Sequence, residues 1–155
     1  MKKYLQKKLN NEKGMTLIEL LAVIVIIAII AAIAIPAIGN IIENSRLSAV
    51  KSDATNVMSA ANIYFTETPN ETTVDTAELI SGGFLDSAGE LSVVATETVV
   101  KNENPISITT TTPITFSGSK TVTFTNATVN GITGNTIKGS AVPAGGLTIT
   151  ATPTP

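Results

Sequence analysis

The sequence predicts an α+β protein in which a long N-terminal helix packs on a small C-terminal antiparallel β-sheet. An apolar run fills residues 20–38, and apolar residues continue at helical spacing to about residue 67. Segments of period two, rich in Val, Ile and Thr, follow from residue 90 onward. A helix followed by a series of strands is typical of the α+β class. The chain has 155 residues, enough for one modest domain with an appendage.

The run LLAVIVIIAIIAAIAIPAI at residues 20–38 contains no charged or polar side chain. About 20 helical residues at 1.5 Å each cross a hydrocarbon core of roughly 30 Å, so this run is long enough to span a bilayer. Residues 1–14 hold five Lys against one Glu, a charge of +4. Basic residues before the run and few after it predict a cytoplasmic N-terminus and a C-terminus outside. A plain signal anchor and a cleaved secretory signal both stay open here.

The predicted helix does not stop at the membrane edge. Apolar residues recur with gaps of three and four, which places one apolar stripe along a helix. They are Leu47, Val50, Ala54, Val57, Ala61 and Tyr64. Residues from Thr16 to about Glu67 therefore form one helix, roughly 75 Å long at 1.5 Å per residue. Pro36 removes a backbone donor and crowds the preceding turn, so we expect a kink or local loosening at Pro36 and Gly39.

The C-terminal part reads as a short helix and then strands. Asp75-Thr-Ala-Glu78 has the form of a capping box and predicts a helix over residues 76–81 that Gly82-Gly83 ends. Strands are expected in LSVVATETVV, ISITTTT, PITF, KTVTFTNATV and LTITAT, with a hairpin connection at residues 116–120. Val122 and Phe124 alternate with Thr, as in an antiparallel sheet with one buried and one wet face. The tail TPTP is expected to be frayed.

The composition argues against an enzyme. The chain has no Cys and no His, the usual bases, nucleophiles and soft metal ligands. Outside residues 1–14 the net charge is −6, which does not suit a basic nucleic-acid surface. The acids between residues 67 and 90 lack the spacing of a calcium loop. We therefore expect no catalytic residue, no metal site and no cofactor.

One acid, Glu19, stands at the front of the apolar run in KGMTLIELLAV. An ionisable side chain within a membrane segment costs at least ~2.5 kcal/mol by insertion scales, and such residues usually serve a function. The alternative without a specific function is that Glu19 lies near the membrane interface, where its carboxylate reaches water among the lipid headgroups. This alternative does not explain why Gly14 directly precedes the segment, or why the helix continues as an amphipathic helix beyond the membrane.

KGMTLIELLAVIVIIAIIAAIAIPA strongly resembles the class III signal and N-terminal helix of type IV prepilins and pseudopilins. The matching features are a short Lys-rich leader, the residues of the motif, the apolar run and a proline within it. The motif residues are Gly14, Thr16, Leu17, Glu19 and Pro36. The resemblance covers residue 13 to about residue 50, where glycine, the acid five places on and the apolar run coincide. The C-terminal hundred residues carry no motif of their own.

The resemblance implies that a membrane aspartyl prepilin peptidase cuts between Gly14 and Met15 and N-methylates Met15. Family members most often have Phe where this chain has Met15, which is an apolar substitute. The implied assembly residues are Thr16 and Glu19, with Glu19 meeting the Met15 amine of a neighbouring subunit. Pro36 and Gly39 lie where the helices of the family commonly lose helical order within filaments.

Four parts of the chain follow from these patterns and the resemblance. They are a cleaved basic leader at 1–14, a transmembrane and assembly helix at 15–39, its amphipathic continuation at 40–67, and a globular β-rich head at 68–155. The implied partners are other copies of the chain, the prepilin peptidase, the pilus assembly platform with its assembly ATPase, and the membrane before assembly. Nucleic acid enters only through an assembled filament.

The implied function is a type IV pilus subunit, inserted in the cytoplasmic membrane before assembly and extracellular afterwards. Such a filament serves adhesion, twitching motility or DNA uptake. Two alternatives stay open. The chain is a minor pilin or pseudopilin of a competence or type II secretion-like system, or it is a membrane-anchored surface binding module that never polymerises.

Overall fold

The computed structural model describes the backbone of residues 2–152 and the side chains of residues 17–92 and 94–152. The chain divides into two compact units, residues 1–39 and residues 40–155, which we call the N-terminal unit and the head unit. Helix α1, Lys2–Glu67, contributes residues to both units. The tail that was expected to be frayed lies outside the described residues from residue 153 onward.

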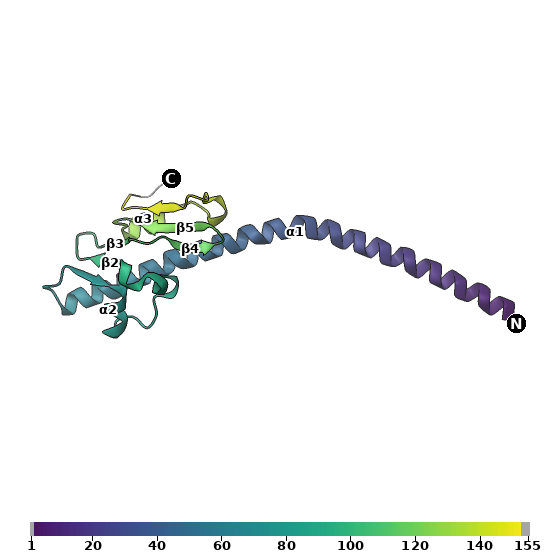
Figure 1. Ribbon diagram of the computed structural model, residues 1–155, viewed down its shortest axis with the longest axis horizontal. Coiled ribbons are helices and arrows are strands. Elements are labelled where there is room, and N and C mark those ends of the chain that lie inside the picture. The colour runs from purple at the N-terminus through teal and green to yellow at the C-terminus, as the bar shows by residue number, and fades with distance from the viewer. Residues whose placement is uncertain (1, 153–155) are drawn as a thin grey trace. The chain divides into compact units, whose positions relative to one another are not determined.

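The long helix and the β-rich part confirm the α+β class (Figure 1). After α1 come β1 (Thr73–Asp75) and α2 (Thr76–Ser81), then the 3-10 helix η1 (Gly89–Glu97). Strands β2 (Thr98–Lys101), β3 (Ser107–Thr110), β4 (Ile114–Ser117) and β5 (Lys120–Phe124) follow. Helix α3 (Val129–Gly134), the 3-10 helix η2 (Gly139–Ala141) and β6 (Leu147–Ile149) complete the described chain.

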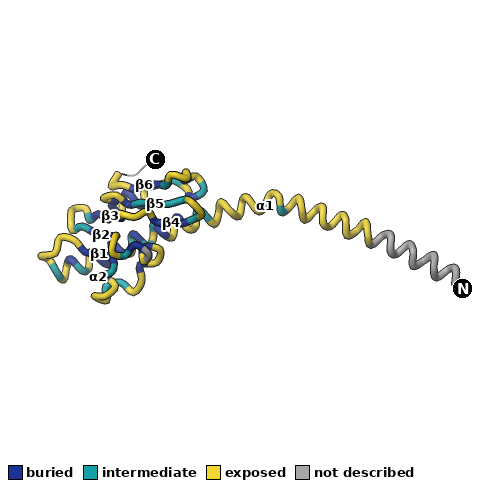
Figure 2. Tube along the Cα trace, viewed as in Figure 1, coloured by how far each residue is buried: buried dark blue, intermediate teal, exposed yellow. Residues whose placement is uncertain are grey.

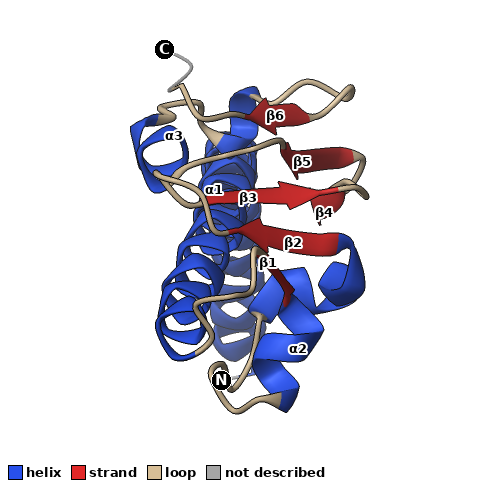
Figure 3. Ribbon diagram, turned by 90° about the vertical axis from the view of Figure 1, so that its left-hand side faces the viewer, coloured by secondary structure: helices blue, strands red, loops and turns tan. Residues whose placement is uncertain are grey.

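The strands form two three-stranded sheets, ordered β1-β2-β3 and β4-β5-β6. An isolated antiparallel bridge pairs Ile108 of β3 with Ala127, three residues after the end of β5, and Figure 3 shows the strands of the two sheets side by side in one layer against α1. Four of the strand pairings are described, and three of them are antiparallel as expected. The fourth, β5 with β6, is parallel, so the β4-β5-β6 sheet is mixed, whereas the β1-β2-β3 sheet is antiparallel. Parallel neighbours require a long crossover, which here is residues 125–146 with α3 and η2.

The apolar stripe predicted along the second half of α1 is confirmed as the centre of the core. Leu47, Val50, Ala54, Val57 and Ala61 are each at most 2% exposed. Figure 2 shows this part of α1 changing to buried where it enters the head unit. The sheet supplies the facing side chains, which include Val100, Ile108, Val122, Phe124 and Ile149. Removal of this apolar surface from water is the main force that holds the helix on the sheet.

The local signals at α2 and β5 are confirmed. The Asp75 carboxylate accepts a hydrogen bond from the Glu78 N–H at 2.7 Å, and the Glu78 carboxylate accepts one from the Asp75 N–H at 3.1 Å. This reciprocal pair is the predicted capping box. In β5, Val122 and Phe124 are buried while Thr121 and Thr123 are partly exposed, as the alternation predicts.

Two expectations about the C-terminal part were wrong. Residues 91–97 form η1 rather than the start of a strand. Leu91 and Val94 are both buried, and the backbone leaves helical geometry at Val94, where two short 3-10 segments meet at a kink. Residues 129–134 form α3 rather than continuing the strand, because the Thr128 hydroxyl accepts a hydrogen bond from the Gly131 N–H and caps a new helix.

Candidate functional site

The residues of KGMTLIELLAV lie in the helical backbone of α1, in the N-terminal unit. The structure describes only the backbone of Gly14, Met15 and Thr16. Glu19 is described and is exposed on the helix surface. Among the described side chains the only ion pair joins Glu43 and Lys120, so Glu19 has no counter-ion there. A carboxylate in this setting requires either water or a cation from another molecule.

The apolar side chains that follow Glu19 are exposed. Helix α1 is long and apolar enough to cross a membrane. Its most apolar stretch of 18 residues has a mean hydropathy of 3.2, and none of its residues is buried. The exposed large side chains extend from Leu17 to Ile42. Contiguous apolar surface of this extent marks a membrane or protein interaction site. Folding of this chain alone therefore leaves the segment without an apolar environment.

Small residues interrupt the large ones along this segment. Ala22, Ala28 and Ala32 are exposed, and Ala31 and Ala34 are partly so. Alanines among Ile and Val side chains allow another helix to approach closely. The backbone stays helical through Pro36 and Gly39, and the space around Gly39 where a side chain would lie is open.

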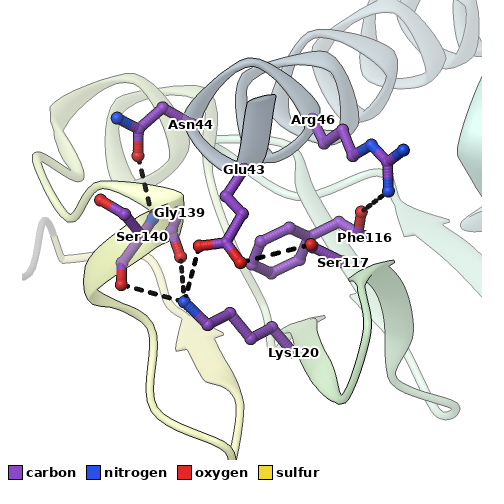
Figure 4. A network of polar contacts seen from close by, with 8 residues as sticks. All are labelled: Glu43, Asn44, Arg46, Phe116, Ser117, Lys120, Gly139 and Ser140. Carbon is purple, nitrogen blue, oxygen red and sulfur yellow. Dashed lines mark hydrogen bonds and ion pairs between the residues drawn. The ribbon is translucent and has the colours of Figure 1, made fainter. Parts of the chain in front are cut away.

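The head unit holds the first turns of its helix through a polar network at Glu43, Asn44 and Arg46 (Figure 4). The Lys120 ammonium lies 2.8 Å from a Glu43 carboxylate oxygen and donates to the carbonyls of Gly139 at 3.2 Å and Ser140 at 2.9 Å. Ser117 donates to the other Glu43 oxygen at 3.5 Å. One ammonium thus ties helix α1, the β4–β5 hairpin and the loop at η2 together.

Two further contacts complete this network. The Ser140 N–H donates to the Asn44 side-chain oxygen at 2.9 Å, and Arg46 donates to the Phe116 carbonyl at 3.5 Å. Gly139 is buried against the helix, and a Cβ at this position would overlap the Glu43 carbonyl oxygen. Only glycine therefore allows the loop to approach α1 this closely.

Five residues after Arg46 on α1, Lys51 contacts the segment after α3. Its ammonium donates to the backbone oxygen and to the side-chain oxygen of Asn135, each at 2.9 Å. Burial lowers the pKa of Lys51 from its ordinary value, because a partly desolvated ammonium is less favourable than a neutral amine. A hollow of about 270 Å³ opens beside Lys51 and is lined by hydroxyl groups. Those residues are Ser48, Ser52, Thr55 and Thr133.

Sequence reasoning did not find the Glu43–Lys120 and Lys51–Asn135 contacts. The partners are separated by 77 and 84 residues, and a single sequence does not display pairs at that separation. One available signal was that Glu43 and Lys51 lie next to the predicted apolar stripe, where charged side chains border the buried face of a helix.

Comparison with known families gives one match. Residues 9–35 match the model of the prokaryotic N-terminal methylation motif. No curated protein and no solved structure matches the chain. The match contains Gly14, Met15, Glu19 and most of the apolar run. Together with the apolar helix, it fits a membrane-anchored precursor and a surface pilus. The chain thus carries the class III signal peptide of type IV pilins and pseudopilins, and this motif supports a type IV pilin or pseudopilin.

Proposed function

We propose that the chain is a structural subunit of a type IV pilus, polymerised through its N-terminal helix into a surface filament. One observation carries this proposal: a methylation motif opens a helix whose apolar side chains are exposed over residues 17–42. A secreted domain with an ordinary leader would lose such a segment on cleavage. The proposed cut between Gly14 and Met15 lies before the apolar run, so the mature chain would keep that run.

Processing removes residues 1–14 and leaves Met15 as the new N-terminus. The prepilin peptidase cuts between Gly14 and Met15 on the cytoplasmic side and methylates the Met15 amine. Cleavage discards the +4 charge of the leader and keeps the apolar helix. The membrane holds the subunit through residues 15–39, with the head outside, until the assembly platform and its ATPase move the subunit into the filament.

Glu19 sets the register of assembly. After cleavage, the amine of Met15 and the carboxylate of Glu19 are the charges at the front of an otherwise apolar helix. Opposite charges attract strongly in a low dielectric, although desolvation offsets much of the gain. A subunit that is displaced along the filament axis leaves both charges unpaired in an apolar environment. The Glu19 carboxylate of an incoming subunit therefore meets the Met15 amine of its neighbour, and Thr16 lies within the same turn.

The apolar helix has two environments in this proposal. Before assembly its side chains are dissolved in lipid, and afterwards they pack helix against helix, with the alanines allowing close approach. Pro36 and Gly39 mark a segment that loses helical order in the filament, because Pro36 lacks an N–H donor and Gly39 has open space where a side chain would lie.

Two other functions use the same motif or the same helix. A minor pilin or pseudopilin of a competence or secretion system would be processed identically and would form a short filament. A membrane-anchored binding module would keep the helix in the bilayer permanently. The large exposed apolar surface with its single acid favours polymerisation over the anchor, because an anchor gains nothing from Glu19 in hydrocarbon.

Two measurements test the proposal. Mass spectrometry of the mature protein should find N-methylated Met15 as the first residue, and an unprocessed N-terminus would overturn it. Electron microscopy should find surface filaments that disappear on deletion of the gene. Filaments composed mainly of this chain identify a major subunit. Filaments that contain only traces of it identify the minor-pilin alternative.

A further inference from the structure

The charges of the head unit are unevenly distributed along the chain. Residues 52–100 contain eight acids and neither Lys nor Arg, Lys101 and Glu103 follow, and residues 104–155 contain two Lys and no acid. The fold brings both of these Lys to the first turns of the head helix, since Lys120 contacts Glu43 and Lys138 directly precedes Gly139. The start of the head helix therefore gathers Arg46, Lys51, Lys138 and Lys120, of which Lys120 is paired with Glu43, and we call it the cationic end of the head unit.

Two hollows accompany the cations at this end. Arg46 is exposed, and its only described hydrogen bond is the 3.5 Å contact to the Phe116 carbonyl. A hollow of about 300 Å³ lies beside it and is also lined by Glu90, with which Arg46 forms no described ion pair. Lys51 borders the second hollow and contacts amide oxygens of Asn135 rather than a carboxylate. Both cations therefore keep capacity for an acidic partner.

The other end of the head helix carries exposed acids. Glu67 is the last residue of α1, and Glu71 lies in the loop that follows. Both are exposed, and neither carboxylate takes part in a described hydrogen bond or ion pair. The next two acids differ, because Asp75 and Glu78 are engaged in the capping box of α2. Glu67 and Glu71 are thus the uncommitted acids at this end.

Acids and cations at opposite ends of one helix do not meet within one copy. Sixteen residues separate Lys51 from Glu67, and twenty-one separate Arg46 from Glu67. At 1.5 Å per residue these separations are about 24 and 32 Å along the helix. Two copies placed head to tail bring the acidic end of one to the cationic end of the next. Such a heterologous contact repeats without closing and produces a filament.

We propose that Glu67 and Glu71 of one copy dock against Arg46 and the Lys51 hollow of the next copy along the filament. This contact rests on the proposed function, because it presupposes that copies stack. It differs from the register contact of Glu19, since it joins head units and not apolar helices. Exposed ion pairs contribute little affinity individually, so the contact selects orientation and speeds docking.

Charge reversal in the full-length chain tests this contact. R46E and the double variant E67K/E71K should each lower the yield of sheared surface filaments about tenfold, because like charges then face each other across the contact. The combination of all three changes should restore the yield to within about threefold, since opposite charges face again. Glu97 is exposed at the end of η1 and lines neither of the two hollows, so E97K is the matched control and should keep the wild-type yield.

Two further measurements make the result decisive. Thermal unfolding and mass spectrometry of each variant should show a folded, cleaved chain, because the substituted side chains are exposed. They are Arg46, Glu67, Glu71 and, in the control, Glu97. Unchanged yields in R46E and E67K/E71K would overturn the contact, as would a triple variant that folds and is cleaved but gives no more filaments than R46E. Failure of the wild-type chain to form filaments would instead overturn the proposed function itself, and the contact with it.

Discussion

Residues 17–39 and residues 40–67 are both helical, yet their apolar side chains have opposite fates. In the first segment the large apolar side chains are exposed on every side of the helix, and no residue of its most apolar 18-residue stretch is buried. In the second, an apolar stripe at three- and four-residue spacing is buried against the sheet. The difference indicates that the second segment satisfies its apolar face within the chain, whereas the first requires lipid or other copies.

The largest expected effect comes from placing a charge on each segment in turn. Val57 is fully buried, so V57D should lower the free energy of unfolding of the head unit by roughly 3–5 kcal/mol. The matched change I27D lies on the exposed segment and should leave that free energy unchanged. Thermal unfolding of both variants in detergent, followed by near-ultraviolet circular dichroism, measures the effect. Equal destabilisation by both changes would contradict the division into two segments.

A smaller effect is expected where the loop at η2 meets the helix. A methyl group at Gly139 would overlap the Glu43 carbonyl, so G139A should destabilise the head unit by about 1–3 kcal/mol through forced backbone shifts. Gly145 has open space where its side chain would lie, which makes G145A the control with no expected loss. Denaturant titration of the two variants compares them. A G139A midpoint equal to that of G145A would show that the close approach is dispensable.

The polar network at the start of the head helix should contribute less. K120M keeps the length and apolar stem of the side chain but removes the ion pair with Glu43 and the donors to two carbonyls. Because the pair is partly exposed to solvent, we expect a loss of about 1–2 kcal/mol. Denaturant titration should show this loss at low salt and a smaller one at high salt. The same loss in E43Q/K120M as in K120M would confirm that the two side chains act together.

The smallest effect concerns the protonation of Lys51. Its pKa is lowered by burial in the folded chain, so between that pKa and the ordinary value of 10.5 the unfolded chain binds more protons. The free energy of unfolding should therefore rise with pH within this alkaline window and level off above it. K51M should lack this rise, which unfolding curves at several alkaline pH values would detect. A fall in stability of the wild-type chain relative to K51M over the window would contradict the assignment.

Much of the fold was predictable because its signals are local. The stripe from Leu47 to Ala61 follows from spacing alone, and the capping box of α2 needs only Asp75 and Glu78. The 3-10 helix η1 was missed because its conformation depends on tertiary burial, and α3 was missed because its cap, Thr128, ends a run of residues whose composition favours a strand. The parallel pairing of β6 was missed because strand direction follows from the crossover and not from strand composition.

The candidate site divides in the same way. The methylation motif was visible in the sequence because its residues are contiguous, and the family match covers the same segment. The contacts of Glu43 and Lys51 were not visible, since each joins the helix to a residue more than seventy positions away. Contiguous motifs are thus accessible to sequence reasoning, whereas the anchorage of the helix requires the structure.

The central claim is that the exposed helix assembles with other copies through Glu19. The most direct measurement is the piliation of an E19A strain, combined with mass spectrometry of the mature N-terminus. We predict that cleavage before Met15 continues and that surface filaments are lost, because the Met15 amine of a neighbour then has no carboxylate to meet. Normal filaments in the E19A strain would contradict the account.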